Sequence, residues 1–168
     1  VLGKGDLVVL ISQSGEAADT LAALRLAKRR GVATLAIVNA AGSSMAREAD
    51  HTLYTHAGPE ISVASTKAFA VQLGLLYLMV LGIAMGKQQL SEQETARHTQ
   101  ELLETVEKTR QVLEYNGVFR KLAPSFAGTD SLFYVGRGMN QALAMEGSLK
   151  LKEISYIHSE AYAAGELK

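Results

Sequence analysis

Residues 7–16 read Leu-Val-Val-Leu-Ile-Ser-Gln-Ser-Gly-Glu, and this stretch decides the fold of the chain. The first five residues are a continuous apolar run, which is typical of a strand buried on both faces, as in parallel sheets. The next five are small or polar, and a segment rich in alanine and leucine with helical spacing follows them. A strand that turns directly into a helix is the repeating unit of an α/β fold, so the sequence predicts parallel strands.

The same alternation of strand and helix continues towards residue 84. A helix is predicted over residues 17–30, and Gly31 stands where a C-terminal cap belongs. A β-rich run, a short helix, a more polar strand and a long helix are predicted next, over residues 32–38, 43–50, 51–56 and 61–84. This spacing predicts right-handed parallel crossovers and an α/β fold with a doubly wound parallel sheet flanked by helices.

A second strand–turn–helix unit follows a charged helical connector. The connector is predicted over residues 91–115, with a capping box of Ser91 and Glu94 at its start. Asn116 and Gly117 are predicted to end it, before a strand over residues 131–135 and a helix over residues 140–155. We therefore predict two domains, residues 1–116 and residues 117–168.

Composition and charge exclude several classes of function. Of the 168 residues, 48% are hydrophobic and 20% are charged, as in a packed globular protein, and 17 basic residues balance 17 acidic ones. This balance gives no electrostatic footprint for nucleic acid or an anionic membrane. Cysteine is absent and the four histidines lack paired ligand spacing, so neither disulfides nor a metal site are predicted.

Residues 68–86 form an uncharged stretch that is close to the length of a membrane span. Gln72 and several glycine and alanine residues interrupt its apolar character, and no second stretch of this kind occurs. We therefore predict no membrane segment here, but a helix that is buried between a sheet and a partner surface.

The serine loop, residues 12–16, has the composition of an anion site. The first N–H groups of the helix that follows lack intrahelical partners, and the helix dipole favours negative charge there. The hydroxyls of Ser12 and Ser14 add neutral donors, Gly15 permits a tight turn, and no basic residue occurs before Arg25. The same residues also fit a second interpretation, in which a serine merely caps a helix.

The helix over residues 140–155 carries charged groups along one face. Glu146, Lys150 and Glu153 stand at positions i, i+4 and i+7, and an amine beside a carboxylate can relay protons in a dry site. An exposed ladder of ion pairs has the same spacing, so this alternative stays open. The preceding Gly136-Arg137-Gly138 is not a dinucleotide motif, because Gln141 occupies the place of the third glycine.

Three segments together resemble one known family, the isomerase half of the glutamine:fructose-6-phosphate amidotransferases, which is built from two sugar-isomerase (SIS) domains. The segments are Ser12–Glu16, Glu60–Lys67 and Glu146–His158 with its continuation to Lys168, and the resemblance covers essentially the whole chain. It implies a flavodoxin-like three-layer αβα fold. It also implies that the first domain lacks its N-terminal strand and that the second is only begun.

The resemblance implies a role for individual residues. Ser12, Gln13 and Ser14 would bind the sugar phosphate, while the Val63 backbone and the Ser65 side chain would hold sugar hydroxyls. Ala17 stands where the family has a threonine, so one hydroxyl to the phosphate is lost and the backbone N–H remains. Glu153 would carry a proton between the first two carbons of the open-chain sugar, and Lys150 would assist proton exchange between their oxygens.

The resemblance also implies partners. The ligands would be fructose 6-phosphate and glucosamine 6-phosphate, with no metal or organic cofactor, because the carbonyl of the sugar makes the adjacent proton acidic. A homodimer, a glutaminase domain on the same parent chain and a cytoplasmic location are expected. Val1 is not a start methionine and Lys168 follows a loop, so we expect a fragment that is inactive alone.

Two alternatives share the serine loop. One is a related SIS aminosugar-phosphate isomerase, deaminase or deglycase, and the other is a non-catalytic SIS domain that senses a phosphosugar. A sensor has no need of Lys150 and Glu153 in register, which favours an enzyme.

Overall fold

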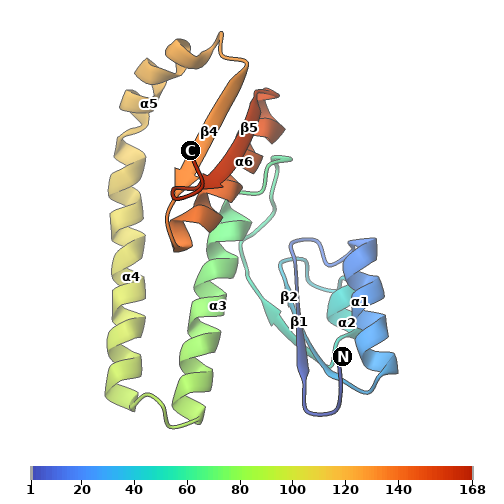
Figure 1. Cartoon of the computed structure of the whole chain (residues 1–168). Coiled ribbons are helices and arrows are strands. Elements are labelled where there is room, and N and C mark those ends of the chain that lie inside the picture. The colour runs from blue at the N-terminus through green and yellow to red at the C-terminus, as the bar shows by residue number, and fades with distance from the viewer. Residues whose placement is uncertain (1, 168) are drawn as a thin grey trace. The chain divides into compact units, whose positions relative to one another are not determined.

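The computed structural model describes residues 2–167, and its strands are parallel and joined by helices, as in an α/β fold (Figure 1). The described residues form two compact units. Unit 1 contains residues 2–61 and Thr66–Thr95, and unit 2 contains Ser62–Ser65 and residues 96–167. The division at residues 1–116 and 117–168 stays a prediction, and its outer ends, Val1 and Lys168, lie outside the described residues.

Unit 1 is built on a three-stranded parallel sheet in the order β1-β2-β3. Its elements follow the predicted alternation: β1 (Leu7–Ser12), α1 (Ala18–Arg29), β2 (Ala33–Val38), α2 (Ser44–Glu48) and β3 (His51–Tyr54). The sheet advances in one direction, so both crossovers bring their helices to the same face, where α1 and α2 lie side by side (Figure 1).

The core of unit 1 lies between that face and the helices. Leu10, Ala36 and Val38 from the sheet pack with Leu24 of α1 and Met45 of α2. The opposite face of the sheet is also apolar but stays open to solvent. Its outer residues Leu7, Ile11 and Leu53 keep 49%, 41% and 36% of their surface exposed.

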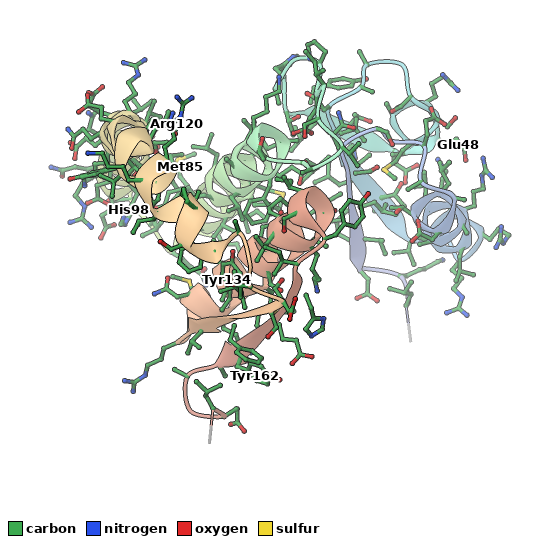
Figure 2. All side chains as sticks on the ribbon, turned by 90° about the horizontal axis from the view of Figure 1, so that it is seen from above. Glu48, Met85, His98, Arg120, Tyr134 and Tyr162 are labelled. Carbon is green, nitrogen blue, oxygen red and sulfur yellow. The ribbon has the colours of Figure 1, made fainter. Side chains whose placement is uncertain are left out.

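A polar cluster ties the helices of unit 1 to the sheet. The Asp50 carboxylate accepts hydrogen bonds from the backbone N–H and the hydroxyl of Thr34, at 3.0 and 2.7 Å, and the Lys28 ammonium lies 2.9 Å from its other oxygen. Arg25 of α1 holds the Glu48 carboxylate with two hydrogen bonds, and Figure 2 shows Glu48 beside this helix. These bonds fix α2 against α1 and β2.

The long apolar helix α3 (Lys67–Gly86) begins six residues later than the predicted start at Ile61. Residues 61–66 form a loop instead, and the Glu60 carboxylate accepts the Thr66 N–H just before the helix. Only Ala68 and Leu81 of α3 are buried. By length and composition alone this is the one helix among residues 2–167 that could cross a membrane, and 11% of its apolar window is buried.

Helix α4 (Glu92–Glu114) starts at the predicted capping box and leads into unit 2. The Ser91 hydroxyl accepts the Glu94 N–H, and the Glu94 carboxylate accepts the Ser91 N–H. The prediction that Asn116 and Gly117 end the helical region was wrong. They begin another helix, α5 (Asn116–Leu122), and the short 3-10 turn η1 (Ala123–Phe126) follows it.

Unit 2 repeats the strand–helix–strand pattern with β4 (Ser131–Gly136), α6 (Met139–Ser155) and β5 (His158–Ala163). The strands β4 and β5 are parallel, with Ser131 opposite His158. The sequence prediction treated the segment after α6 as a loop and missed β5. Its alternation of polar and small residues hides the strand, although Ser159 is fully buried.

Close contacts fix α6 against this two-stranded sheet. A Cβ atom on Gly147 would come within 2.9 Å of the Tyr134 ring on β4, which lies against α6 (Figure 2). The hydroxyls of Ser148 and Ser159 lie 2.9 Å apart, and the Ser159 hydroxyl also donates to the Ser148 carbonyl at 2.8 Å. The helix is thus held at a fixed height on the sheet.

Candidate functional site

The serine loop lies at the carboxyl end of β1, as predicted, where open α/β sheets bind ligands. The Ser12 hydroxyl oxygen accepts the Gly15 N–H at 3.0 Å, and the Ser14 hydroxyl oxygen accepts the Glu16 N–H at 3.2 Å. Both hydroxyl oxygens therefore act as acceptors for the loop backbone. Their protons remain able to turn towards an anion.

The start of α2 holds the shape of the serine loop. Gly15 is buried at φ 68°, and a Cβ atom there would lie 2.2 Å from the Ser43 hydroxyl oxygen. The Met45 N–H donates to the Gly15 carbonyl at 3.0 Å. The Ser44 N–H donates to the Glu16 carboxylate at 2.7 Å, and this bond holds the pKa of Glu16 below its ordinary value. The loop is therefore rigid before any ligand arrives.

Ala17 forms the start of α1 with an extended backbone, and its side chain provides no cap. A threonine at this place could bond the first turn of the helix, whereas alanine leaves that turn to solvent or to a ligand. The exposure of Ser14 and Ala17 keeps this end of α1 accessible. The interpretation of the serine loop as an ordinary capped helix start is therefore weakened.

A polar hollow of about 440 Å³ lies beside the serine loop in unit 1. It is lined by Gln13, Asn39, Ala40, His56, Gly58 and Pro59. Sequence reasoning missed Asn39 and His56. The signal for Asn39 was its place directly after β2, because the ends of parallel strands meet at one edge of the sheet.

Asn39 organises the wall of this hollow. Its amide oxygen accepts the Thr55 hydroxyl at 3.0 Å and the Ala57 N–H at 2.8 Å, and its amide nitrogen donates to the Gly58 carbonyl. Next to these bonds His56 has a φ of 51°, which is uncommon outside glycine. The chain after β3 is therefore pinned in a shape that leaves room beside Gln13.

The structure does not bring Val63 and Ser65 together with the serine loop in one compact unit. Both belong to Ser62–Ser65, which is grouped with unit 2, whereas residues 12–16 belong to unit 1. Val63 is 95% exposed, and Ser65 is half-buried next to the buried Ala64. Their contacts to sugar hydroxyls remain a prediction.

Helix α6 brings its three predicted charged residues together, and we call Glu146, Lys150 and Glu153 the α6 triad. The Lys150 ammonium lies 2.6 Å from the nearer Glu153 oxygen and 3.5 Å from a Glu146 oxygen. The Glu153 hydrogen bond and the charge of Glu146 hold the pKa of Lys150 above its ordinary value. The triad is thus an ammonium ion between two carboxylates.

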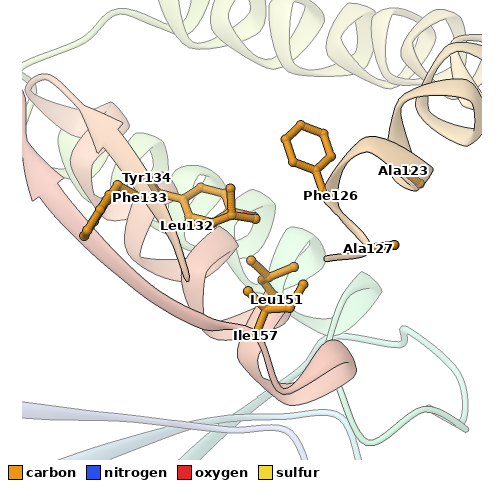
Figure 3. A pocket seen from close by; sticks show the side chains of 8 residues that line it. All are labelled: Ala123, Phe126, Ala127, Leu132, Phe133, Tyr134, Leu151 and Ile157. Carbon is orange, nitrogen blue, oxygen red and sulfur yellow. The ribbon is translucent and has the colours of Figure 1, made fainter. Parts of the chain in front are cut away.

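A second hollow, in unit 2, has a different character. It has a volume of about 430 Å³ and lies between η1, β4 and α6, where Phe126, Leu132, Tyr134, Leu151 and Ile157 line it (Figure 3). Its walls are aliphatic and aromatic. It therefore offers packing space rather than acid–base chemistry.

Comparison with known proteins adds independent findings. The family model described as "SIS domain" matches residues 1–82 and 125–168. Over all 168 residues the chain is 54% identical to the glutamine–fructose-6-phosphate aminotransferase [isomerizing] of Caldanaerobacter subterraneus subsp. tengcongensis. It is 52% identical to the enzyme of the same name from Clostridium tetani.

A solved structure is similar over almost the whole chain. It is the C-terminal domain of glucosamine-fructose-6-phosphate aminotransferase from Francisella tularensis, with a TM-score of 0.95 and 44% identity. The match covers 99% of this chain and 47% of that one. The chain spans 28% of the length of each of the two curated relatives, and therefore corresponds to a part of them.

Proposed function

This chain belongs to the SIS domain family, and from that premise we propose that it is a phosphosugar-binding and proton-transferring part of an isomerising glutamine–fructose-6-phosphate aminotransferase. The reaction would convert fructose 6-phosphate into glucosamine 6-phosphate with ammonia derived from glutamine. Curated relatives with this name, more than 50% identical over all 168 residues, support the proposal.

The serine loop would hold the phosphate group. Its hydroxyls and the first N–H groups of α1 are neutral donors, and the positive end of the helix dipole adds favourable charge. No lysine or arginine lies within residues 12–16, so hydrogen bonds rather than ion pairs would dominate recognition. The braced backbone around Gly15 supports this role, because a preformed cradle loses little conformational entropy when it binds.

The α6 triad would carry the proton transfer. The Glu153 carboxylate would remove a proton from the first carbon of the open-chain sugar and return it to the second carbon. The Lys150 ammonium would donate to the heteroatoms on these two carbons while their protonation changes. A charged lysine in hydrogen-bond contact with a carboxylate is in the right protonation state for both tasks.

The observation that carries the proposal is the 2.6 Å contact between Lys150 and Glu153. A domain that only binds a phosphosugar needs no such pair. In the full-length protein that contains this sequence, Glu153→Gln should lower kcat by about 10²–10⁴-fold, as removal of a general base typically does. An unchanged kcat would exclude Glu153 as the base.

A binding measurement separates this function from its alternatives. Calorimetric titration of the full-length protein with glucosamine 6-phosphate should detect binding that unphosphorylated glucosamine lacks and that Ser14→Ala weakens. Phosphosugar binding without synthesis of glucosamine 6-phosphate would favour a sensor. Net deamination or deglycation would favour a related SIS enzyme. Absence of binding would reduce the serine loop to a capped helix start.

Assembly belongs to the same proposal. We expect the full-length protein to be a homodimer in which α3 contributes to the covered surface, and to carry a glutaminase domain that supplies ammonia. The support for α3 is its composition, since it is apolar around its circumference and nearly all of it is accessible in the single chain.

A further inference from the structure

Glu146 has no role in the chemistry described so far, yet it is the second partner of the Lys150 ammonium. Lys150 Nζ lies 3.5 Å from Glu146 Oε1 and 2.6 Å from Glu153 Oε2. The three side chains stand on the side of α6 opposite to Ser148, which packs against β5. One positive charge is thus shared by two carboxylates, only one of which is assigned to proton transfer.

The environment of the α6 triad differs from that of an ordinary helix ion pair. Its side chains are 19–31% exposed, whereas those of the Arg110–Glu107 pair on α4 are 72% and 63% exposed. Fully exposed pairs are screened by water and contribute little. Partial burial makes both carboxylates matter for where the ammonium lies and whether it keeps its proton.

No other charged group competes for this ammonium from the strands that pack on α6. Strand β4 carries no acidic or basic residue, and β5 carries His158 and Glu160. These two lie 3.4 Å apart, and Glu160 also accepts the Tyr162 hydroxyl. The charge on Lys150 therefore has two sources of support within the described residues, Glu153 and Glu146.

We propose that Glu146 is a positioning residue, which holds the Lys150 ammonium in place while Glu153 carries the substrate proton. The inference rests on the function proposed above. When Glu153 takes up a proton it becomes neutral, and its bond to Lys150 loses the charge that made it strong. Glu146 takes no part in the transfer and stays ionised, so it keeps Lys150 charged and directed at the substrate in that step.

The test is a steady-state analysis of Glu146→Gln in the full-length protein. We expect kcat to fall roughly 10- to 100-fold, the range seen when a residue that orients a catalytic group is removed, with KM nearly unchanged. The alkaline limb of the pH–rate profile should move to lower pH, because Lys150 loses a neighbouring negative charge that stabilises its protonated form. Glu146→Asp keeps the charge and should restore part of both effects.

Glu107→Gln is the matched control, since it breaks an exposed glutamate–arginine pair on α4, and it should leave kcat, KM and the pH profile unchanged. The inference is overturned if Glu146→Gln binds glucosamine 6-phosphate normally and behaves like this control. If Glu146→Gln does not fold, Glu146→Asp decides, and a pH profile and kcat identical to those of the parent would overturn the role. A parent protein without isomerase activity would instead refute the proposed function itself.

Discussion

At the scale of single residues, Asp50 links the fold to pH. The hydrogen bonds from Thr34 and then from Lys28 lower the pKa of its carboxyl to about 2, against about 3.9 in an unfolded chain. A carboxyl whose pKa is lower in the folded state stabilises the fold above its unfolded pKa. This contribution is lost as the pH falls through the folded pKa.

We therefore expect the urea midpoint of unit 1 to fall between pH 5 and pH 2, and to fall less steeply in Asp50→Asn. Hydrogen exchange at β2 can follow this unit alone. Asp130→Asn removes one aspartate from unit 2 and serves as the control. A wild-type midpoint that does not change over this range, or a slope in Asp50→Asn as steep as in the wild type, would contradict the assignment.

The residues of the candidate site were predictable where chemistry and chain order coincide. Ser12 and Ser14 could be placed at the end of β1 because an apolar run stops there. The contact of Glu16 with Ser44 could not be predicted, since it joins residues 28 positions apart. Asn39 and His56 escaped prediction for the same reason, because their importance depends on which strands become neighbours.

At the scale of elements, the two serines between α6 and β5 set the height of the helix that carries the triad. Ser148 is 2% exposed and Ser159 is fully buried, so removal of one hydroxyl leaves the other without its side-chain partner. We expect Ser159→Ala to lower the free energy of unfolding of unit 2 by about 1–3 kcal/mol.

Denaturant unfolding of the variants can test this. The exposed Ser131→Ala, at the start of β4, should change the free energy of unfolding by less than about 0.5 kcal/mol. The double variant Ser148→Ala/Ser159→Ala should lose less than the sum of the two single changes, because both buried hydroxyls then disappear. Equal effects of Ser159→Ala and Ser131→Ala would show that the buried pair does not hold the helix.

The errors in predicted elements have physical causes. The helix predicted from Ile61 begins only at Lys67, because local polar side chains such as Glu60 satisfy the loop before it. Gly117 did not end the helical region, since a single glycine costs a helix only about 1 kcal/mol. Strand β5 was missed because its pairing with β4, rather than its composition, creates it.

At the scale of the whole molecule, helix α3 is the main exposed apolar surface. Leu73, Leu78 and Val80 are 45%, 42% and 58% exposed. If α3 forms part of a dimer interface, a lysine at position 80 would place an unpaired charge in an apolar contact. Light scattering of the full-length protein at micromolar concentration should then give a dimer for the wild type and a smaller mass for Val80→Lys.

Val112→Lys, which introduces the same charge at a 56% exposed position on α4, is the control and should remain dimeric. A monomeric wild type, or a Val80→Lys variant that stays dimeric, would remove α3 from the interface. The general architecture was accessible from sequence at this scale, because strand and helix alternate twice. The arrangement of subunits was not, because it depends on surfaces rather than on periodicity.

The sheet of unit 1 has a practical consequence for anyone who produces this chain. Strand β1 ends the order β1-β2-β3, and the face that carries Leu7, Ile11 and Leu53 stays open. An unpaired strand edge beside a greasy surface is a starting point for aggregation. Yield in the soluble fraction, with and without flanking sequence from a parent gene, is therefore a simple readout of whether those neighbours shield the sheet.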